Sequence, residues 1–151
     1  MVVLLLDDDP SWLRALGRLL ERRGASVIQL TSPDTLFEHI AVQTPDVMAL
    51  DFLLGKGETG AAVARVLREQ LRDSCPPLLL VSATLQDVSD RDLVLFDAAY
   101  SKDTPPADLV RTLLERGGLA STSRSRASLR AAQVGELGRE PPAEESWSSE
   151  G

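Results

Sequence analysis

Five short apolar runs restrict the fold of this chain more than any other feature of its sequence. They lack the polar and apolar alternation of half-exposed strands, so they fit the strands of a parallel sheet that is covered on both faces. The runs lie at residues 2–6, 26–30, 47–50, 78–81 and, more weakly, 98–100.

Helical patterns fill the segments between and after these runs, with apolar residues recurring on one face. Apolar stripes at residues 12–20, 62–71 and 109–114 mark three of the expected helices, the second and fourth lie at about residues 33–43 and 87–96, and Pro105-Pro106 opens the last. Signals for helix ends agree with this division, and the Gly117-Gly118 pair predicts the end of the last helix. Five-fold alternation of strand and helix predicts an α/β fold, a doubly wound sheet with right-handed crossovers.

The composition changes after residue 118, where Ser, Thr, Arg, Glu, Gly and Pro dominate. We therefore predict a domain at residues 1–118 and a mostly disordered polar tail at residues 119–151, in which residues 128–137 are the candidate for a short helix. The tail is too short and too polar for a helix-turn-helix, so no DNA-binding domain is expected. The net charge of −7, without a basic cluster, also disfavours nucleic acid.

Neither a targeting signal nor a membrane segment is indicated by the sequence. The first apolar run is very short and is followed at once by acidic residues, unlike a signal peptide, and no stretch is long enough to cross a bilayer. Cys75 is the single cysteine and cannot form an internal disulfide. These features predict a cytoplasmic protein.

Polar residues follow the ends of four of the five predicted strands. Asp7 and Asp8 follow the first strand, and Asp51 follows the third. Ser82 follows the fourth strand and Lys102 the last. In a doubly wound sheet these ends meet at one crevice, the usual ligand site. Each residue alone has an ordinary explanation as a cap or surface group, but converging carboxylates repel one another unless a cation or a proton intervenes. Oxygen ligands of this kind favour Mg²⁺.

The strings around these residues resemble the receiver domain of response regulators. They are LLLDDDP at Asp7 and Asp8, LD at Asp51, LVSA at Ser82 and SKD at Lys102. The resemblance spans roughly residues 1–118. It implies a flavodoxin-like fold, a doubly wound five-stranded parallel sheet in the order 2-1-3-4-5 with five helices.

The resemblance also implies a role for each residue of the set. Asp51 is the expected phosphoacceptor, and Ser82 and Lys102 are expected to contact the phosphoryl group. Mg²⁺ is the expected cofactor, with ligands from Asp7, Asp8, Asp51 and the backbone carbonyl of Leu53.

The implied function is that of a stand-alone signalling protein of a two-component or phosphorelay system. It would take a phosphoryl group from a histidine kinase or a phosphotransfer protein and signal by binding a downstream protein, which the sequence does not identify. Beyond self-phosphorylation from a donor and auto-dephosphorylation, no enzymatic activity is expected.

Several positions depart from the family's usual pattern. Asp103 stands where proline usually follows the lysine, and Gly55 replaces a frequent proline in the loop after the acceptor. Ala99 occupies the position of the family's aromatic switch residue, and Tyr100 comes one place later, which on a strand means the opposite face. We therefore expect Tyr100 to be a core or rim residue and not an aromatic relay.

Two positions are expected to set the lifetime of the phosphorylated state. By resemblance, Leu53 and Thr84 line the route of the hydrolytic water, and neither side chain has the reach or charge of Glu or Gln to orient it. A phosphoryl group on Asp51 should therefore be comparatively long-lived.

Alternatives from other classes remain open. A pseudo-receiver would keep the fold as a binding module without becoming phosphorylated. The DDDPS string also resembles the opening motif of haloacid-dehalogenase-type phosphatases, in which Asp7 would be the nucleophile and Asp9 the acid/base, but Asp51 would then be unexplained. A flavodoxin-like cofactor-binding protein is disfavoured because no glycine-rich phosphate loop follows the first run.

Overall fold

The structure, a computed structural model, describes residues 1–137. The chain divides into two units, Met1–Ser121 and Thr122–Gly151. The first unit contains a five-stranded parallel sheet in the order β2-β1-β3-β4-β5. Its strands are β1 (Val2–Leu6), β2 (Ser26–Leu30), β3 (Val47–Leu50), β4 (Leu78–Ser82) and β5 (Ala98–Ser101). The predicted fold class and strand order are confirmed.

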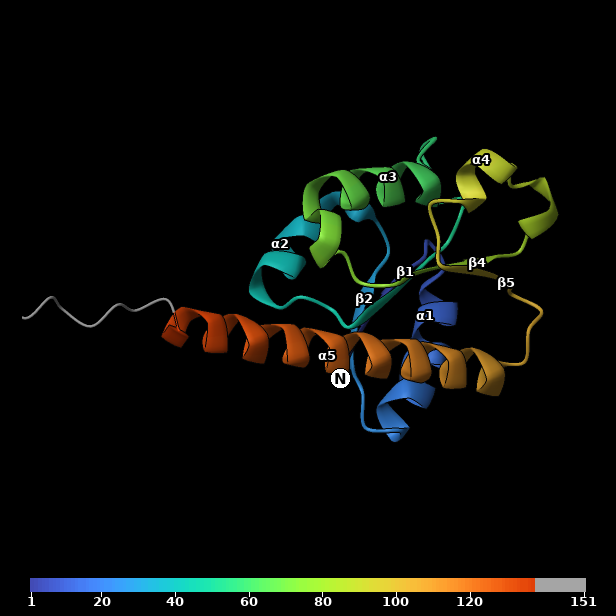
Figure 1. Cartoon of the computed structure of the whole chain (residues 1–151). Coiled ribbons are helices and arrows are strands. Elements are labelled where there is room, and N and C mark those ends of the chain that lie inside the picture. Colours follow the sequence, from blue (N-terminus) through green and yellow to red (C-terminus); the bar gives the residue numbers. More distant parts are fainter. Residues whose placement is uncertain (138–151) are drawn as a thin grey trace, which may run out of the picture. The chain divides into compact units, whose positions relative to one another are not determined.

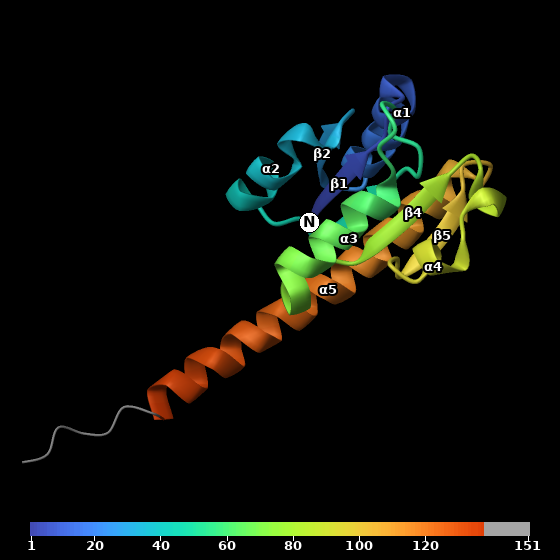
Figure 2. The same cartoon turned by 90° about the horizontal axis from the view of Figure 1, so that it is seen from above.

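Helices cover both faces of this sheet (Figure 1; Figure 2). One face packs against α1 (Pro10–Arg22) and the first turns of α5 (Pro106–Leu137). The other face packs against α2 (Leu36–Val42), α3 (Gly60–Leu71) and the short α4 (Asp90–Leu93). Short 3₁₀ turns join these elements at η1 (Pro33–Thr35), η2 (Arg72–Ser74) and η3 (Leu85–Asp87).

The sheet is buried on both sides because successive side chains of a strand point to opposite faces. In β1, Leu4 and Leu6 join the apolar cluster under α2 and α3, whereas Val3 and Leu5 join the cluster under α1 and α5. Each fully buried leucine contributes about 2 kcal/mol of transfer free energy. The continuous apolar runs of the sequence thus reflect central strands with no solvent face, and the edge strands β2 and β5 are the partly exposed exceptions.

The last helix differs most from its prediction. Helix α5 continues through Gly117 and Gly118 to Leu137, so the predicted helix end at this pair is wrong, whereas the division into a domain at residues 1–118 and a polar tail stays a prediction. Neither glycine has the left-handed backbone of a helix C-cap. A β-carbon on Gly117 would instead press against Met1 and Val47, so this glycine permits close packing. Residues 138–151 of the predicted tail lie outside the described residues.

The fourth helix is also shorter than predicted. Instead of one helix over residues 87–96, the structure has the η3 turn followed by the single turn of α4. The hydroxyl of Ser89 accepts a hydrogen bond from Asp92 N at 3.3 Å and so starts α4 later than expected. Within residues 1–137, no helix has the length and apolar character needed to cross a membrane.

Candidate functional site

Two aspartates are fixed by the backbone where adjacent strands end. Asp7 follows β1, and its N–H donates to Leu30 O at 3.1 Å. Asp51 follows β3, and its N–H donates to Leu6 O at 2.9 Å. The parallel ladder therefore brings the two residues to the same edge of the sheet, at the carboxyl ends of β1 and β3.

Asp9 serves as the N-cap of α1. Its carboxylate accepts hydrogen bonds from Ser11 N at 2.9 Å and Trp12 N at 3.3 Å, while Pro10 occupies the first helical position. The N–H of Asp9 donates to Asp7 Oδ1 at 2.9 Å. The start of α1 is thereby tied to the acidic cluster, and Asp9 has the ordinary capping role that its position suggests.

The loop after Asp51 is closed by a tight contact with the start of α3. Gly60 N donates to Phe52 O at 2.7 Å, and Phe52 N donates to Asp51 Oδ1 at 2.8 Å. A β-carbon on Gly60 would overlap the carbonyl oxygen of Asp51, so only glycine fits there. The loop itself turns through left-handed residues, among them Gly55 at φ 79° and Gly57 at φ 76°.

Lys102 reaches the two buried aspartates from the end of β5. Its Nζ lies 2.6 Å from Asp7 Oδ2 and donates a hydrogen bond to Asp51 Oδ2 at 3.2 Å. Its backbone N–H donates to Ser82 O at 3.0 Å, which fixes the base of the side chain beside β4. Nζ also lies 5.0 Å from the centre of a Trp12 ring.

Burial and mutual repulsion perturb the acidic pair. Burial is the largest cause that raises the pKa of Asp51, and the negative charge of Asp7 raises it further. These two effects outweigh the lowering by Lys102, so that the pKa of Asp51 is about 6. Burial likewise raises the pKa of Asp7. Burial alone would lower the pKa of Lys102, but its contacts with Asp7 and Asp51 outweigh this and raise it. The cluster thus has more negative charge than one ammonium can neutralise.

The acidic cluster fits a hard divalent cation. Asp7, Asp8 and Asp51 each offer a carboxylate oxygen, and these three atoms lie within 4.8 Å of one another. Asp7 Oδ2 is buried and forms a 2.6 Å ion pair with the Lys102 ammonium, with no other partner among the described residues. A buried carboxylate oxygen in this state is a suitable ligand for a hard cation such as Mg²⁺ or Ca²⁺.

The remaining predicted site residues lie near the same edge, with different surroundings. Ser82 ends β4 and is buried, and its hydroxyl accepts a hydrogen bond from Thr84 N at 3.1 Å. Thr84 Oγ1 lies 3.4 Å from the same hydroxyl. Leu53 is 53% exposed and pairs through its backbone with Thr59. No hydrogen bond of the described residues joins Ser82 to Asp51, so the cluster itself consists of Asp7, Asp8, Asp51 and Lys102.

Tyr100 and Ala99 point to opposite faces of β5. Tyr100 packs with the cluster of α1 and α5, whereas Ala99 packs with the cluster of α2, α3 and α4. The expectation that Tyr100 is a core or rim residue agrees with this position. The side of β5 that faces α4 therefore has alanine where the resemblance leads one to expect an aromatic ring.

Sequence reasoning did not identify two residues that shape the site. Trp12 lies next to Lys102 in space although 90 positions separate them in the sequence, and no local sequence pattern predicts such a contact. Residue 60 must be glycine because its backbone lies so close to the carbonyl of Asp51. The available sequence signal was the Thr59-Gly60 pair before an apolar stripe, which is typical of a helix start. In the structure, Thr59 caps α3 by accepting a hydrogen bond from Ala62 N at 3.1 Å.

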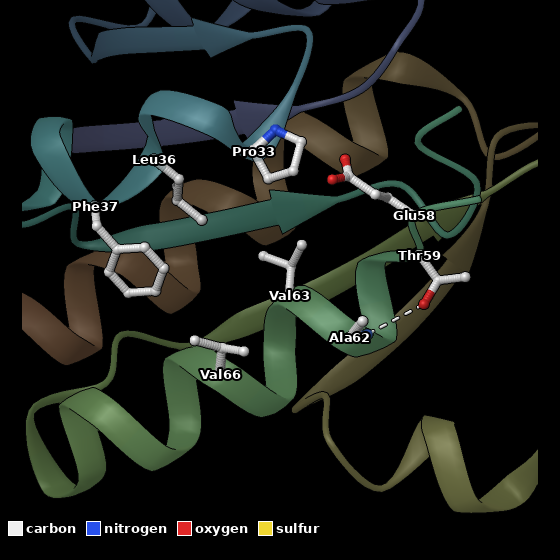
Figure 3. Close-up of a pocket in the computed structure, with 8 residues that line it drawn as sticks. All are labelled: Pro33, Leu36, Phe37, Glu58, Thr59, Ala62, Val63 and Val66. Carbon is white, nitrogen blue, oxygen red and sulfur yellow. Dashed lines mark hydrogen bonds between the residues drawn. The ribbon is translucent and has the colours of Figure 1, made fainter. Parts of the chain in front are cut away.

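A second hollow in the first unit has a different character (Figure 3). It has a volume of about 230 Å³ between α2 and α3 and is lined by Pro33, Leu36, Phe37, Glu58, Thr59, Ala62, Val63 and Val66. Its lining is mainly apolar and its one charged residue is Glu58, so it offers no cation for an anionic ligand. This hollow therefore differs in chemistry from the acidic cluster.

A doubly wound parallel sheet with buried carboxylates and a lysine at its carboxyl edge defines the chain as a flavodoxin-like protein with an acidic pocket. A sequence model described as the response regulator receiver domain matches residues 3–113. The chain belongs to this family and is a receiver domain of the kind found in two-component response regulators. The family match favours the receiver over the phosphatase alternative, and Asp9, the suggested acid/base of the latter, is a helix cap.

Known proteins resemble different parts of the chain. The protein RcaC of Microchaete diplosiphon is 32% identical over 80 residues, which cover 53% of this chain and 12% of RcaC. This chain therefore spans a small fraction of that relative. The BeF₃-activated N-terminal receiver domain of Klebsiella pneumoniae RstA is 26% identical, with a TM-score of 0.66 over 78% of this chain and 98% of that one.

A response regulator protein from Burkholderia pseudomallei, solved with a phosphorylated aspartic acid, a calcium ion and citrate, shares the fold. It has 21% identity and a TM-score of 0.63 over 85% of this chain and 74% of that chain. The receiver domain of a Francisella response regulator aligns with a TM-score of 0.67 at 19% identity, over 78% and 96% of the two chains.

Proposed function

We propose that this receiver domain accepts a phosphoryl group on Asp51, with Mg²⁺, from a histidine kinase or a phosphotransfer protein, and then signals by binding another protein. The observation that carries the proposal is the placement of the Asp51 carboxylate. It lies 3.2 Å from the Lys102 ammonium and within a cluster of cation ligands. The BeF₃-activated form of RstA and the phosphorylated aspartic acid of the Burkholderia protein support it.

The chemistry follows from the two oxygens of Asp51. Phe52 N holds Oδ1, so Oδ2 is the oxygen that attacks phosphorus. As the new P–O bond forms, the P–N bond of the donor phosphohistidine breaks and its electron pair passes to the imidazole nitrogen. With a pKa of about 6, Asp51 is mostly ionised at neutral pH and can act as the nucleophile.

The neighbouring groups would then stabilise the negative charge of the transferred phosphoryl group. Lys102 supplies a positive charge to the phosphoryl oxygens, and Ser82 donates its hydroxyl once it turns from Thr84. Mg²⁺, held by Asp7, Asp8, Asp51 and the Leu53 carbonyl, would neutralise phosphoryl charge. Movement of Ser82 and Lys102 toward the phosphoryl group would reshape the surface that a downstream partner contacts.

The test is intact-mass measurement after incubation with Mg²⁺ and acetyl phosphate. We expect one phosphoryl group on the wild type and none on Asp51→Asn. Asp9→Asn is the matched control, since Asn also caps helices and the residue lies one position from the cluster. Label that persists in Asp51→Asn, or a wild type that takes no label and so behaves as a pseudo-receiver, would contradict the proposal.

The cellular side of the proposal follows from this chemistry. A histidine kinase or phosphotransfer donor requires a cytoplasmic acceptor, and a long-lived phosphoryl group suits a slow signal or one that a separate phosphatase ends. Leu53 is exposed in the loop after Asp51 and Thr84 lies next to Ser82, and we propose that neither side chain orients the hydrolytic water.

A further inference from the structure

Three side chains of the described residues lie next to the ammonium of Lys102, and one of them is uncharged. Two are the carboxylates of Asp7 and Asp51, at 2.6 and 3.2 Å from Nζ. The third is Trp12, whose ring centre lies 5.0 Å from Nζ. This distance is within the range of a cation–π interaction, in which the negative face of the indole attracts the ammonium.

The backbone of Trp12 is tied to the acidic cluster, and its side chain packs on the apolar core. Its backbone N–H donates to the capping carboxylate of Asp9, and Asp9 N donates to Asp7 Oδ1. Its ring packs against the apolar cluster between the sheet, α1 and α5. Trp12 and Lys102 together line a cavity of about 90 Å³ where α1 approaches the start of α5. The packed indole face therefore lies beside the end of the lysine side chain.

The two kinds of contact respond differently to a cation. A divalent ion at the acidic cluster competes with the ammonium for the oxygens of Asp7 and Asp51, because all of these contacts depend on the same negative charge. The indole face has no lone pair that a hard cation prefers, so its attraction for the ammonium remains. Without the indole, the four-carbon stem of Lys102 would be free to turn toward solvent.

We propose that Trp12 is a positioning residue of the phosphorylation site, whose indole face holds the ammonium of Lys102 beside Asp51. The proposal rests on the proposed function, since it assigns Trp12 to the same site. Trp12 acts through Lys102 and does not touch the phosphoryl group itself. Trp12→Leu should therefore release the lysine while it keeps apolar packing, and Trp12→Phe should retain a ring face.

The position of Lys102 can be measured directly, because the chain has two lysines, Lys56 and Lys102. In protein labelled with ¹³C-lysine, an indole ring over the ammonium should shift the Cε proton signals of Lys102 upfield in the metal-free state and with Mg²⁺. The exposed Lys56 provides an internal reference. We expect the upfield shift to disappear in Trp12→Leu and to remain in part in Trp12→Phe.

The second readout is the rate of labelling by acetyl phosphate at saturating Mg²⁺. Loss of a partly buried cation–π contact predicts a rate about fivefold lower in Trp12→Leu. Trp12→Phe should recover most of the rate. Leu19→Ala is the matched control, because Leu19 lies on α1 and lines the same cavity but has no aromatic ring, and its rate should stay within about twofold of wild type.

The outcomes separate this inference from the proposed function. An unshifted Lys102 signal in wild type, or a labelling rate in Trp12→Leu equal to that of Leu19→Ala, would overturn the positioning role while the function of Asp51 stands. If acetyl phosphate does not phosphorylate the wild type, the proposed function is wrong. The NMR signals of Lys102 would then be the remaining test of whether Trp12 holds Lys102. Melting temperatures of all variants exclude unfolding as the cause of a lower rate.

Discussion

Replacing Asp51 by Asn should make the metal-free protein more stable at neutral pH, although Asp51 is the proposed functional residue. The carboxylate is buried beside Asp7, and both burial and the charge of Asp7 oppose its ionisation. Asn has nearly the same shape and can still accept a hydrogen bond from Lys102, but it has no charge to bury. The substitution therefore removes an electrostatic cost of folding.

The size of the effect follows from the pKa of Asp51. A rise from the ordinary value of 3.8 to about 6 opposes folding by about 3 kcal/mol at pH 7, which is an upper limit because Asp7 titrates together with Asp51. The hydrogen bond from Lys102 weakens when its acceptor loses charge, at a cost of about 1 kcal/mol. We therefore expect Asp51→Asn to gain about 1–2 kcal/mol in the free energy of unfolding.

The assay is urea unfolding in EDTA between pH 4.5 and 7.5, with Asp9→Asn as a control. Because the folded protein binds a proton on Asp51 more tightly than the unfolded chain, the cost is fully present above the folded pKa. It is lost as the pH falls through about 6 toward 3.8. The advantage of Asp51→Asn over wild type should therefore shrink across this range. Equal stability of the two proteins at pH 7, or an advantage that grows as the pH falls, would refute the reasoning.

Three further predictions concern the same edge of the sheet. Gly60→Ala should lower the free energy of unfolding by about 2 kcal/mol in urea titrations, because its β-carbon would overlap the backbone of Asp51; an unchanged value would mean that the loop relaxes without cost. Asp8→Ala should weaken Mg²⁺ binding about tenfold by calorimetry, and more than Asp7→Ala does if Asp8 is the direct ligand; equal losses would contradict that assignment. After donor removal, the phosphorylated Leu53→Asn, Thr84→Glu double variant should lose its label about tenfold faster than wild type; an equal decay would show that these side chains do not set the lifetime.

The strands and the acidic cluster could be predicted because both depend on simple features of the chain. A strand that is buried on both faces needs an unbroken apolar run, and β1, β3 and β4 have one. Residues at the carboxyl ends of parallel strands lie close together, and this does not depend on the side chains of the helices. Asp7, Asp51 and Lys102 could therefore be grouped before any contact between them was known.

Features that depend on packing could not be predicted in this way. A Gly-Gly pair is typical of a helix end, but in this structure Gly117 lies within α5 and allows the helix to pack closely against Met1 and Val47. The contact of Trp12 with Lys102 requires the rotamers of two side chains from distant elements. Likewise, residue 60 must be glycine only because the start of α3 lies against the backbone that follows β3, which the sequence does not reveal.

The charge of the acidic cluster has a consequence for which molecules can enter it. Three carboxylates stand against the single ammonium of Lys102, so the empty pocket repels anions. Inorganic phosphate and nucleotides, which are abundant in any cell, are therefore disfavoured as occupants until a divalent cation has reversed the local potential. We therefore expect a divalent cation to bind before any phosphodonor, because only the cation reverses the local potential.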